Sequence, residues 1–140
     1  MMFVLDTNIL SAMMHVRPVP EVTEWIAGQD EGRLFTTTIS HAEIFSGLAV
    51  MTEGRRRRDL EEAARAMFDE FNGRLLPFDI EAATAYAVIF ADRRRMGRPG
   101  TTLDLMIASV ARSLGASVVT RDIGGFEGCG VPLIDPWALS

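Results

Sequence analysis

Short apolar runs and longer helical patterns alternate along the chain. The runs predict buried strands, because each is only a few residues long and ends at turn-forming residues. The helical patterns repeat apolar residues three or four positions apart, which predicts helices with one buried face. We expect strands at residues 3–5, 34–38, 117–120 and 131–134, with a short extended link at 75–78.

Three helices are expected in the first half of the chain. Pro20 suits the first position of a helix over residues 20–27. Ser40 opens a second helical pattern, and a third runs from Asp59 until Asn72-Gly73 closes it. Helices therefore follow the first two strands.

Two more helices have clear ends in the second half. Asp79 caps one helix, which Gly97 and Pro99 stop. The other has the cleanest amphipathic pattern, from Leu103 to Leu114, and ends at Gly115. The buried stripe expected for the helix after Asp79 consists of Ile80, Ala83, Ala87, Phe90 and Ala91.

Alternating strands and helices predict the fold class. Two parallel strands need a crossover connection, so the alternation indicates an α/β fold with a central, mainly parallel sheet flanked by helices. A chain of 140 residues is the usual size of one domain. We expect residues 1–140 to form a single domain, whose reactive site lies beyond the carboxyl ends of the strands.

The composition narrows the class of protein. Apolar residues make up 48% of the chain, which is typical of a globular protein, and no segment approaches the length of a membrane span. The N-terminal segment lacks the features of a signal peptide, and Cys129 is the only cysteine, so we expect a cytoplasmic protein. The net charge of -5 argues against a general nucleic-acid coat but is compatible with an acidic nuclease site.

Four acidic residues occupy the places where such a site would form. Asp6 and Asp122 follow expected strands, while Glu43 and Asp104 are expected in the first turns of helices. Carboxylates that converge repel one another, so a cluster of them usually holds a cation. Their oxygen atoms suit Mg²⁺ or Mn²⁺, whereas one cysteine and two histidines make a zinc site a poor fit.

Each acid also has a purely structural interpretation. Ser40 and Glu43 have the spacing of a helix capping box, and so do Thr101 and Asp104. Asp6 and Asp122 could simply form turns. The joint arrangement of the four favours a metal site over four independent caps and turns.

The order of these acids and their surroundings resembles the PIN-domain family, and within it the VapC-like and FitB-like toxins. The resemblance covers nearly the whole chain and rests on several segments taken together. These are Val4-Leu5-Asp6-Thr7-Asn8, Ser40-x-x-Glu43 with Gly47, Leu76-Pro77-Phe78-Asp79, Asp104-x-x-Ile107-Ala108, Val119-Thr120-Arg121-Asp122 with Phe126, and the ending from Gly128 to Trp137. One departure is Thr102-Leu103, where the family more often has small residues.

The resemblance implies a ribonuclease that hydrolyses RNA with Mg²⁺ or Mn²⁺ and acts as the toxin of a type II toxin-antitoxin pair. It implies a cognate antitoxin as partner and a homodimer as the usual state. The implied catalytic and metal-binding residues are Asp6, Glu43, Asp104 and Asp122, with Thr7, Asn8 and Thr120 as supporting polar groups. Arg121 and Arg98 are candidates for contact with RNA.

Other functions fit less well. A haloacid-dehalogenase phosphatase needs an aspartate where Asn8 stands, and a phosphorylation receiver needs a lysine, which this chain lacks. The stronger alternative is a PIN-like binding module that acts chiefly within an antitoxin-containing complex on operator DNA.

Overall fold

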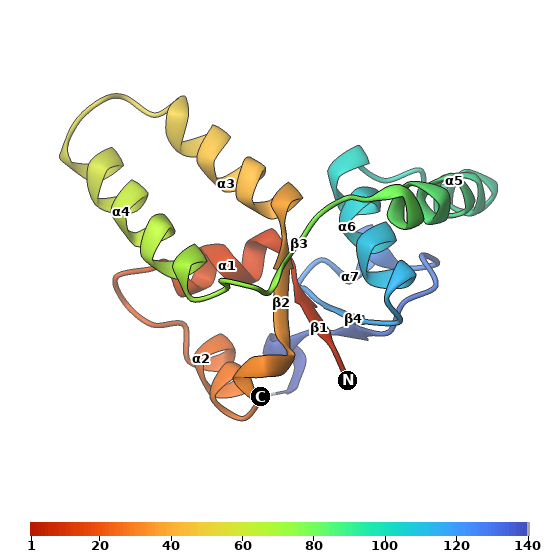
Figure 1. Ribbon diagram of the computed structural model, residues 1–140, viewed down its shortest axis with the longest axis horizontal. Helices are drawn as coiled ribbons and strands as arrows, with labels where there is room; N and C mark the ends of the chain where they lie inside the picture. The colour runs from red at the N-terminus through yellow and green to blue at the C-terminus, as the bar shows by residue number, and fades with distance from the viewer. Residues whose placement is uncertain (140) are drawn as a thin grey trace.

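A five-stranded sheet forms the centre of the molecule. The computed structural model describes residues 1–139 (Figure 1). The strand order is β3-β2-β1-β4-β5, and every pair is parallel, as the alternation of strands and helices predicts. The strands are β1 (Phe3–Leu5), β2 (Leu34–Thr37), β3 (Leu75–Leu76), β4 (Ser117–Val119) and β5 (Leu133–Ile134).

Helices cover both faces of this sheet. Figure 1 shows α1 to α4 on one side of the strands and α5 and α6 on the other. The helices are α1 (Thr7–Met13), α2 (Pro20–Ala27), α3 (Thr38–Ala49), α4 (Arg55–Asp69), α5 (Ile80–Arg95), α6 (Thr102–Ser113) and α7 (Ile123–Phe126), with 3₁₀ turns η1 (Glu31–Arg33) and η2 (Pro136–Leu139). The expected α/β fold is therefore confirmed. None of the helices in this part of the chain is long and apolar enough to cross a membrane.

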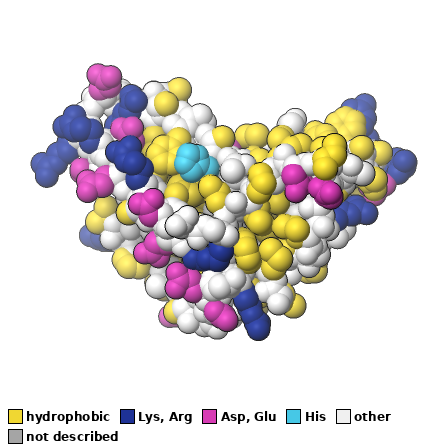
Figure 2. All heavy atoms as spheres, viewed as in Figure 1, with side chains coloured by type: hydrophobic (Ala, Val, Ile, Leu, Met, Phe, Trp, Pro, Cys, Tyr) yellow, Lys and Arg dark blue, Asp and Glu magenta, His cyan; other side chains and the backbone are white. Residues whose placement is uncertain are grey.

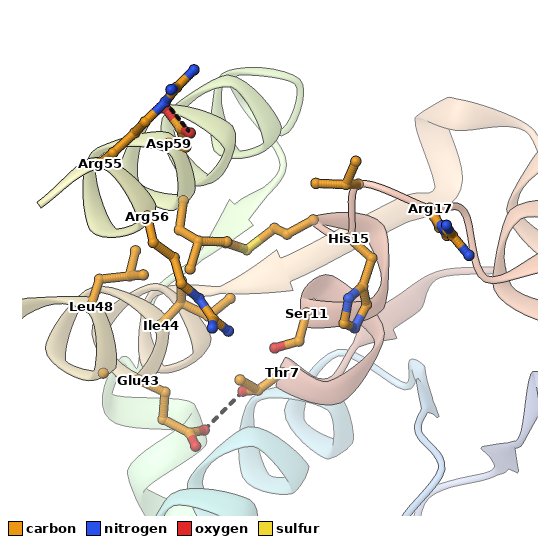
Figure 3. A pocket seen from close by; sticks show the side chains of 14 residues that line it. Thr7, Ser11, His15, Arg17, Glu43, Ile44, Leu48, Arg55, Arg56 and Asp59 are labelled. Carbon is orange, nitrogen blue, oxygen red and sulfur yellow. Dashed lines mark hydrogen bonds and ion pairs between the residues drawn. The ribbon is translucent and has the colours of Figure 1, made fainter. Parts of the chain in front are cut away.

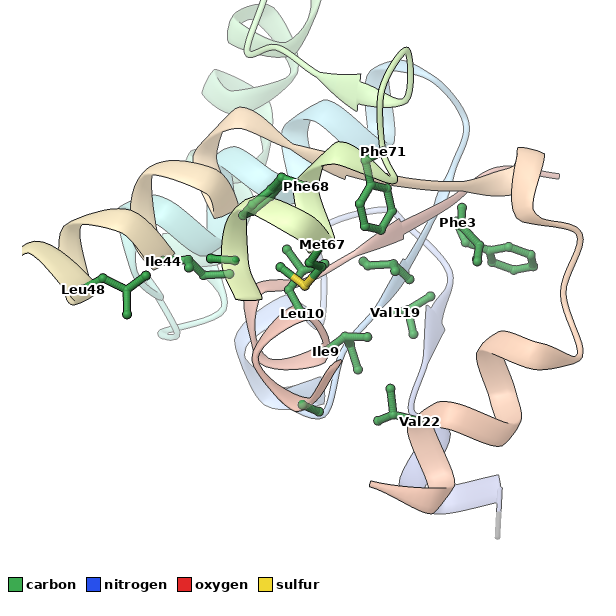
Figure 4. Packing of buried hydrophobic residues seen from close by; sticks show 14 residues of the cluster. Phe3, Ile9, Leu10, Val22, Ile44, Leu48, Met67, Phe68, Phe71 and Val119 are labelled. Atoms are coloured by element: carbon green, nitrogen blue, oxygen red, sulfur yellow. The ribbon is translucent and has the colours of Figure 1, made fainter. Parts of the chain in front are cut away.

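The apolar core has two halves, one on each face of the sheet. Successive side chains of a strand point to opposite faces, so Leu5 and Val119 pack with α1 to α4, while Val4 and Val118 pack with α5 and α6. Figure 4 shows the first half, where Phe68 from α4 lies among these residues. Strands buried on both faces explain why their sequences are continuous apolar runs rather than alternating ones.

The buried face of α5 differs from the one expected. Ile80 is 74% exposed and Phe90 is 40% exposed, while Ala82, Ile89 and Arg93 face the interior. The predicted stripe is wrong because α5 carries apolar residues on two faces, so periodicity alone could not tell which face meets the sheet. An apolar stripe is thus left on the surface of α5.

Three boundaries also differ from those expected. Helix α4 begins at Arg55, four residues before Asp59, so the arginine run forms its first turn. Helix α3 begins at Thr38 instead of Ser40. The glycine-rich segment after Asp122 contains the short helix α7, where we expected only a loop. These differences matter because they move Glu43 and Asp122 relative to the helix ends.

Candidate active site

Asp6 lies at the end of the central strand β1. Its side chain caps α1, where Oδ1 accepts a hydrogen bond of 2.8 Å from the Thr7 amide. The Thr120 hydroxyl donates to Asp6 Oδ2 at 2.8 Å from the neighbouring strand β4. Asp6 is only 4% exposed. A carboxylate held so firmly at the carboxyl edge of a parallel sheet is both a helix cap and a candidate ligand.

Glu43 reaches the same edge from α3. Thr37 caps this helix by accepting from the Ser40 amide at 3.1 Å, so Glu43 lies in the second turn and the expected capping box with Ser40 is wrong. The Thr7 hydroxyl instead donates to Glu43 Oε1 at 2.8 Å and lies 2.9 Å from Ser40 Oγ. Glu43 is therefore tied to the residue next to Asp6 and not to its own helix end.

Asp104 and Asp122 approach each other across Gly125. Asp104 lies in the first turn of α6 as expected, where its amide donates to Thr101 Oγ1. Asp122 caps α7 and accepts from the Gly125 amide at 3.1 Å. A Cβ atom at Gly125 would lie 2.4 Å from Asp122 Oδ2 and 3.2 Å from Asp104 Oδ2. A side chain at position 125 would therefore displace the Asp122 carboxylate from its present place beside Asp104.

One cavity brings the four acids together. It has a volume of about 580 Å³. The residues around it come from α1, α3, α6, the segment after β4 and the C-terminal 3₁₀ turn. They include Asp6, Thr7, Asn8, Ser11, His15, Glu43, Asp104, Arg121, Asp122 and Trp137. The convergence expected from the sequence is present in the structure.

The proton affinities of two acids reflect this crowding. Burial raises the pKa of Asp6 from 3.8 to about 6, against the hydrogen bonds from Thr120 and Thr7, and the nearby charges of Asp104 and Glu43 add to the rise. Burial also raises the pKa of Asp104, with Asp122 and Glu43 contributing and the cation of Arg93 opposing. Carboxyl groups that resist ionisation in a polar cavity are typical of sites completed by a cation.

The fold around this cavity is that of a known family. Residues 3–127 match the family described as PIN domain. The chain belongs to the PIN domain family. All four acids lie within the matched range.

Relatives of this PIN domain include named toxins and ribonucleases. VapC ribonuclease Y4jK from Sinorhizobium fredii is 36% identical and aligns with 97% of this chain and 98% of its own. Toxin FitB from Neisseria gonorrhoeae is 31% identical over 97% of this chain and 99% of its own, and FitAcB from that organism matches the fold with a TM-score of 0.89. VapBC-5 from Mycobacterium tuberculosis, of the VapBC family of toxin-antitoxin systems, is 27% identical over 94% of this chain and 95% of its own, with a TM-score of 0.65.

The carboxylate groups around the cavity of this PIN domain are chemically suited to bind a hard divalent cation. Carboxylate oxygens are the ligands that Mg²⁺ and Mn²⁺ prefer. Within residues 1–139, no three acidic, histidine or cysteine side chains are already arranged around a common ligating point. Hydrogen bonds to Thr120, Thr7 and Gly125 hold the carboxylates apart.

A buried arginine supports the α7 side of the cavity. Arg93 is 2% exposed, and its Nη1 donates to the carbonyl oxygens of Gly124 at 3.1 Å and Glu127 at 2.6 Å. Arg98 Nη1 donates to the Glu127 carboxylate at 2.6 Å, so this RNA-contact candidate is engaged with the α7 segment and does not line the cavity. The two arginines connect the end of α5 to the segment that carries Asp122.

A second hollow opens beside the acids, between α1, α3 and α4. It is an apolar groove of about 1070 Å³, with Ile44, Leu48 and Leu60 among its walls. Figure 3 shows Arg56 extending from α4 toward its middle, and Glu43 joined to Thr7 at its edge. Both hollows share four residues, Thr7, Ser11, His15 and Glu43. The groove therefore leads into the acid cavity.

The structure places the predicted polar residues with the acids and adds others. Thr7, Asn8, Thr120 and Arg121 all lie at or beside the cavity, as expected. Ser11, His15 and Trp137 also line it, although they were not among the expected site residues. Thr7 and Ser11 are four residues apart and lie on one face of α1, so this spacing could have revealed Ser11. His15 lies beyond the end of this helix. Trp137 belongs to the C-terminal segment that carries the family resemblance, but its spacing from the acids gives no sign that it lines the cavity.

The raised pKa of Asp6 predicts a pH-dependent stability. The unfolded carboxyl ionises near pH 4, while the folded one keeps its proton to about pH 6. The folded state therefore binds more protons between these values, and the free energy of unfolding falls as pH rises through this window. In EDTA we expect Asp6→Asn to match the parent at pH 4 and to exceed its stability at pH 7.5 by on the order of 3 kcal/mol.

Urea unfolding at both pH values measures this difference. Asp79→Asn is the matched control, because Asp79 is an exposed helix cap outside the cavity. It should be neutral or slightly destabilising at pH 7.5. If the free energy of unfolding changed with pH in the same way for the parent and for Asp6→Asn, the pKa of Asp6 would not be raised in the folded state.

Proposed function

We propose that this PIN-domain ribonuclease, the toxin of a toxin-antitoxin pair, hydrolyses RNA with Mg²⁺ or Mn²⁺ held by Asp6, Glu43, Asp104 and Asp122. The observation that carries the proposal is the convergence of these four acids, from four separate segments, in one cavity. Their mutual repulsion has no structural benefit, and a divalent ion would remove it. The VapC ribonuclease among the relatives supports RNA as the substrate.

The supporting residues hold the acids in place. A bound divalent ion supplies charge neutralisation at the scissile phosphate and activates a water molecule. Thr120 positions Asp6 by donating to it, and Asn8 fixes Thr120 through Nδ2 at 3.2 Å from the hydroxyl. Thr7 orients Glu43. Asp6 and Asp104 are the surest ligands in this proposal, because Asp6 is buried, Asp104 is half-buried, and the charges of other acids raise the pKa of both.

The alternative of a pure binding module on operator DNA is not favoured. A relative that is 36% identical over nearly the whole chain is a VapC ribonuclease. A protein that only bound DNA would not need four acids in a shared cavity, because phosphates are repelled by them. We place the protein in the cytoplasm, as one domain over residues 1–140, consistent with the free thiol of Cys129.

Metal dependence is tested directly on purified protein. We expect cleavage of single-stranded RNA with Mg²⁺ or Mn²⁺ and none with excess EDTA. Asp6→Asn should reduce the rate by at least about a hundredfold, since it removes a ligand charge at the reacting centre. Asp79→Asn is the control and should cleave like the parent. Cleavage that survives chelation would overturn the metal mechanism.

We propose that the antitoxin binds the apolar groove between α1, α3 and α4. Its volume suits a chain segment with apolar side chains, and an amphipathic helix buries such a face well. A basic side chain at the end of that segment would lie close to Glu43, where the groove meets the acid cavity. One partner could in this way close the groove and neutralise the site.

Gly47 offers a sharp test of this groove. It lines the groove on α3, and a Cβ there meets nothing within 4 Å. Gly47→Leu should therefore fill the groove without harming the fold, and replacing a helical glycine should even stabilise α3 by up to about 1 kcal/mol. We expect loss of the complex with the co-expressed antitoxin and unchanged RNA cleavage.

Ala49→Leu is the matched control, because Ala49 is exposed on the same helix outside the groove. It should leave the complex intact in size-exclusion chromatography. A complex that forms equally well with Gly47→Leu would place the antitoxin elsewhere.

We propose that the dimer forms through the outer face of α5. Ile80 is 74%, Val88 47% and Phe90 40% exposed, and Leu103 at the start of α6 is 43% exposed. Figure 2 shows apolar side chains gathered over the arm of the molecule where Figure 1 places α5. Exposed apolar patches of this kind mark interaction sites. Contact with the same face of a second copy would bury these exposed apolar side chains, which do not pack against the sheet.

Phe90→Glu should convert the dimer to a monomer, because it places a buried charge in each half of a self-complementary interface. Light scattering coupled to gel filtration measures the mass. The control Val50→Glu alters a residue that is 85% exposed at the C-terminal end of α3, and it should remain dimeric. A Phe90→Glu protein of unchanged mass would contradict this interface.

A further inference from the structure

We propose that Arg121, held over the indole of Trp137, binds a phosphate of the RNA strand at the edge of the acid cavity, and that Trp137 is the residue that positions it. This inference rests on the proposed function, because it names how the substrate is held in that same site. In this proposal Arg121 contacts the RNA directly, whereas Trp137 acts only by holding Arg121 in place.

The two side chains form one surface on the cavity wall. The Arg121 guanidinium carbon lies 4.7 Å from the centre of the Trp137 ring, and both residues line the cavity that contains the four acids. Trp137 belongs to η2, which packs on α2, and its amide donates to Asp135 Oδ1 at 2.9 Å. The partly buried Trp137 side chain also packs against the apolar core, so the indole is a platform on which a flexible arginine loses less freedom when it binds a ligand.

The guanidinium is available for a ligand. Residues 1–139 make no hydrogen bond or ion pair to the Arg121 side chain, although acids line the same cavity. By contrast, Arg93 and Arg98 are both occupied by the α7 segment. An arginine that stacks by its face keeps its N–H groups free at the edge, where they match the oxygen atoms of a phosphate.

The backbone of Arg121 is tied to the acid network. Its amide donates to Asn8 Oδ1 at 3.3 Å, and Asn8 in turn donates to the Thr120 hydroxyl that contacts Asp6. Asp122 is the next residue along the chain. The Arg121 guanidinium therefore lies at a set position relative to the four acids. A phosphate bound to it would determine which phosphodiester bond of the RNA strand lies at the acids.

The charge balance of the cavity explains why such a cation is needed. Among the described residues that line it, Arg121 is the one arginine, facing four acids. A nucleic-acid strand that enters meets repulsion from any acid not neutralised by metal. One arginine at the rim offsets part of this repulsion without pairing with the acids themselves.

The salt dependence of cleavage separates a phosphate contact from a structural role. For single strands, each phosphate contact contributes about 0.7 to the slope of log affinity against log salt. We expect Arg121→Gln to make the slope of log(kcat/KM) shallower by about 0.7 and to raise KM by about tenfold or more, with kcat within about twofold. Arg121→Lys should keep the slope and recover part of KM.

Trp137 should behave differently from Arg121. Trp137→Leu is expected to raise KM by about two- to fivefold with the slope unchanged, because the charge remains but its platform is lost. Trp137→Phe should restore most of the loss. The control Arg95→Gln removes an arginine that is paired with Asp92 on α5 and lines neither hollow, and it should match the parent in KM and slope.

A binding measurement keeps the two proposals distinguishable. In an Asp6→Asn background with Mg²⁺, the Kd of a fluorescein-labelled single-stranded RNA should show the same change of slope for Arg121→Gln. A parent that does not cleave RNA would overturn the proposed function, while the Kd series would still decide the role of Arg121. A slope and KM equal to those of Arg95→Gln would overturn the phosphate contact. A loss of slope in Trp137→Phe would overturn the role of the indole as a platform.

Discussion

Parallel pairing of β1 with both β2 and β4 is the constraint on which the rest of the structure depends. It makes three strands end at one edge, so the residues that follow them must meet there. Asp6 and Thr120 come from two of these strand ends, and Thr37 at the third begins the helix that carries Glu43. Because each crossover places a helix against a sheet face, the apolar strands are buried and the polar edge alone faces solvent.

Hydroxyl groups let the acids share this edge. The Thr120 hydroxyl uses its full capacity, donating to Asp6 while accepting from Asn8 and from the Asp122 amide at 3.0 Å. Thr7 joins Glu43 to Ser40 in a similar way. These bonds stabilise the ionised carboxylates, but burial outweighs them for Asp6, whose pKa is raised to about 6. The hydrogen bonds therefore fix the positions of the carboxylates but do not neutralise their negative charge.

Periodicity and turn chemistry predict most of this architecture, and the exceptions have physical causes. The strands, the cap at Asp79 and the convergence of the four acids follow from local pattern and from the rule for parallel sheets. The position of Glu43 in its helix does not, because Thr37 and Ser40 can both cap and only tertiary packing selects one. The buried face of α5 and the meeting of Arg121 with Trp137 depend on residues distant in sequence, which no local pattern records.

The wall common to the groove and the acid cavity has a consequence for the balance between partner and substrate. Thr7, Ser11, His15 and Glu43 face both spaces. A protein seated in one and a strand seated in the other must use the same side chains, so the two binding free energies are coupled. Linkage is reciprocal, and whatever factor the partner removes from RNA affinity, RNA removes from the partner. Abundant substrate would thus lower the fraction of the protein held in the inhibited complex, with no separate signal required.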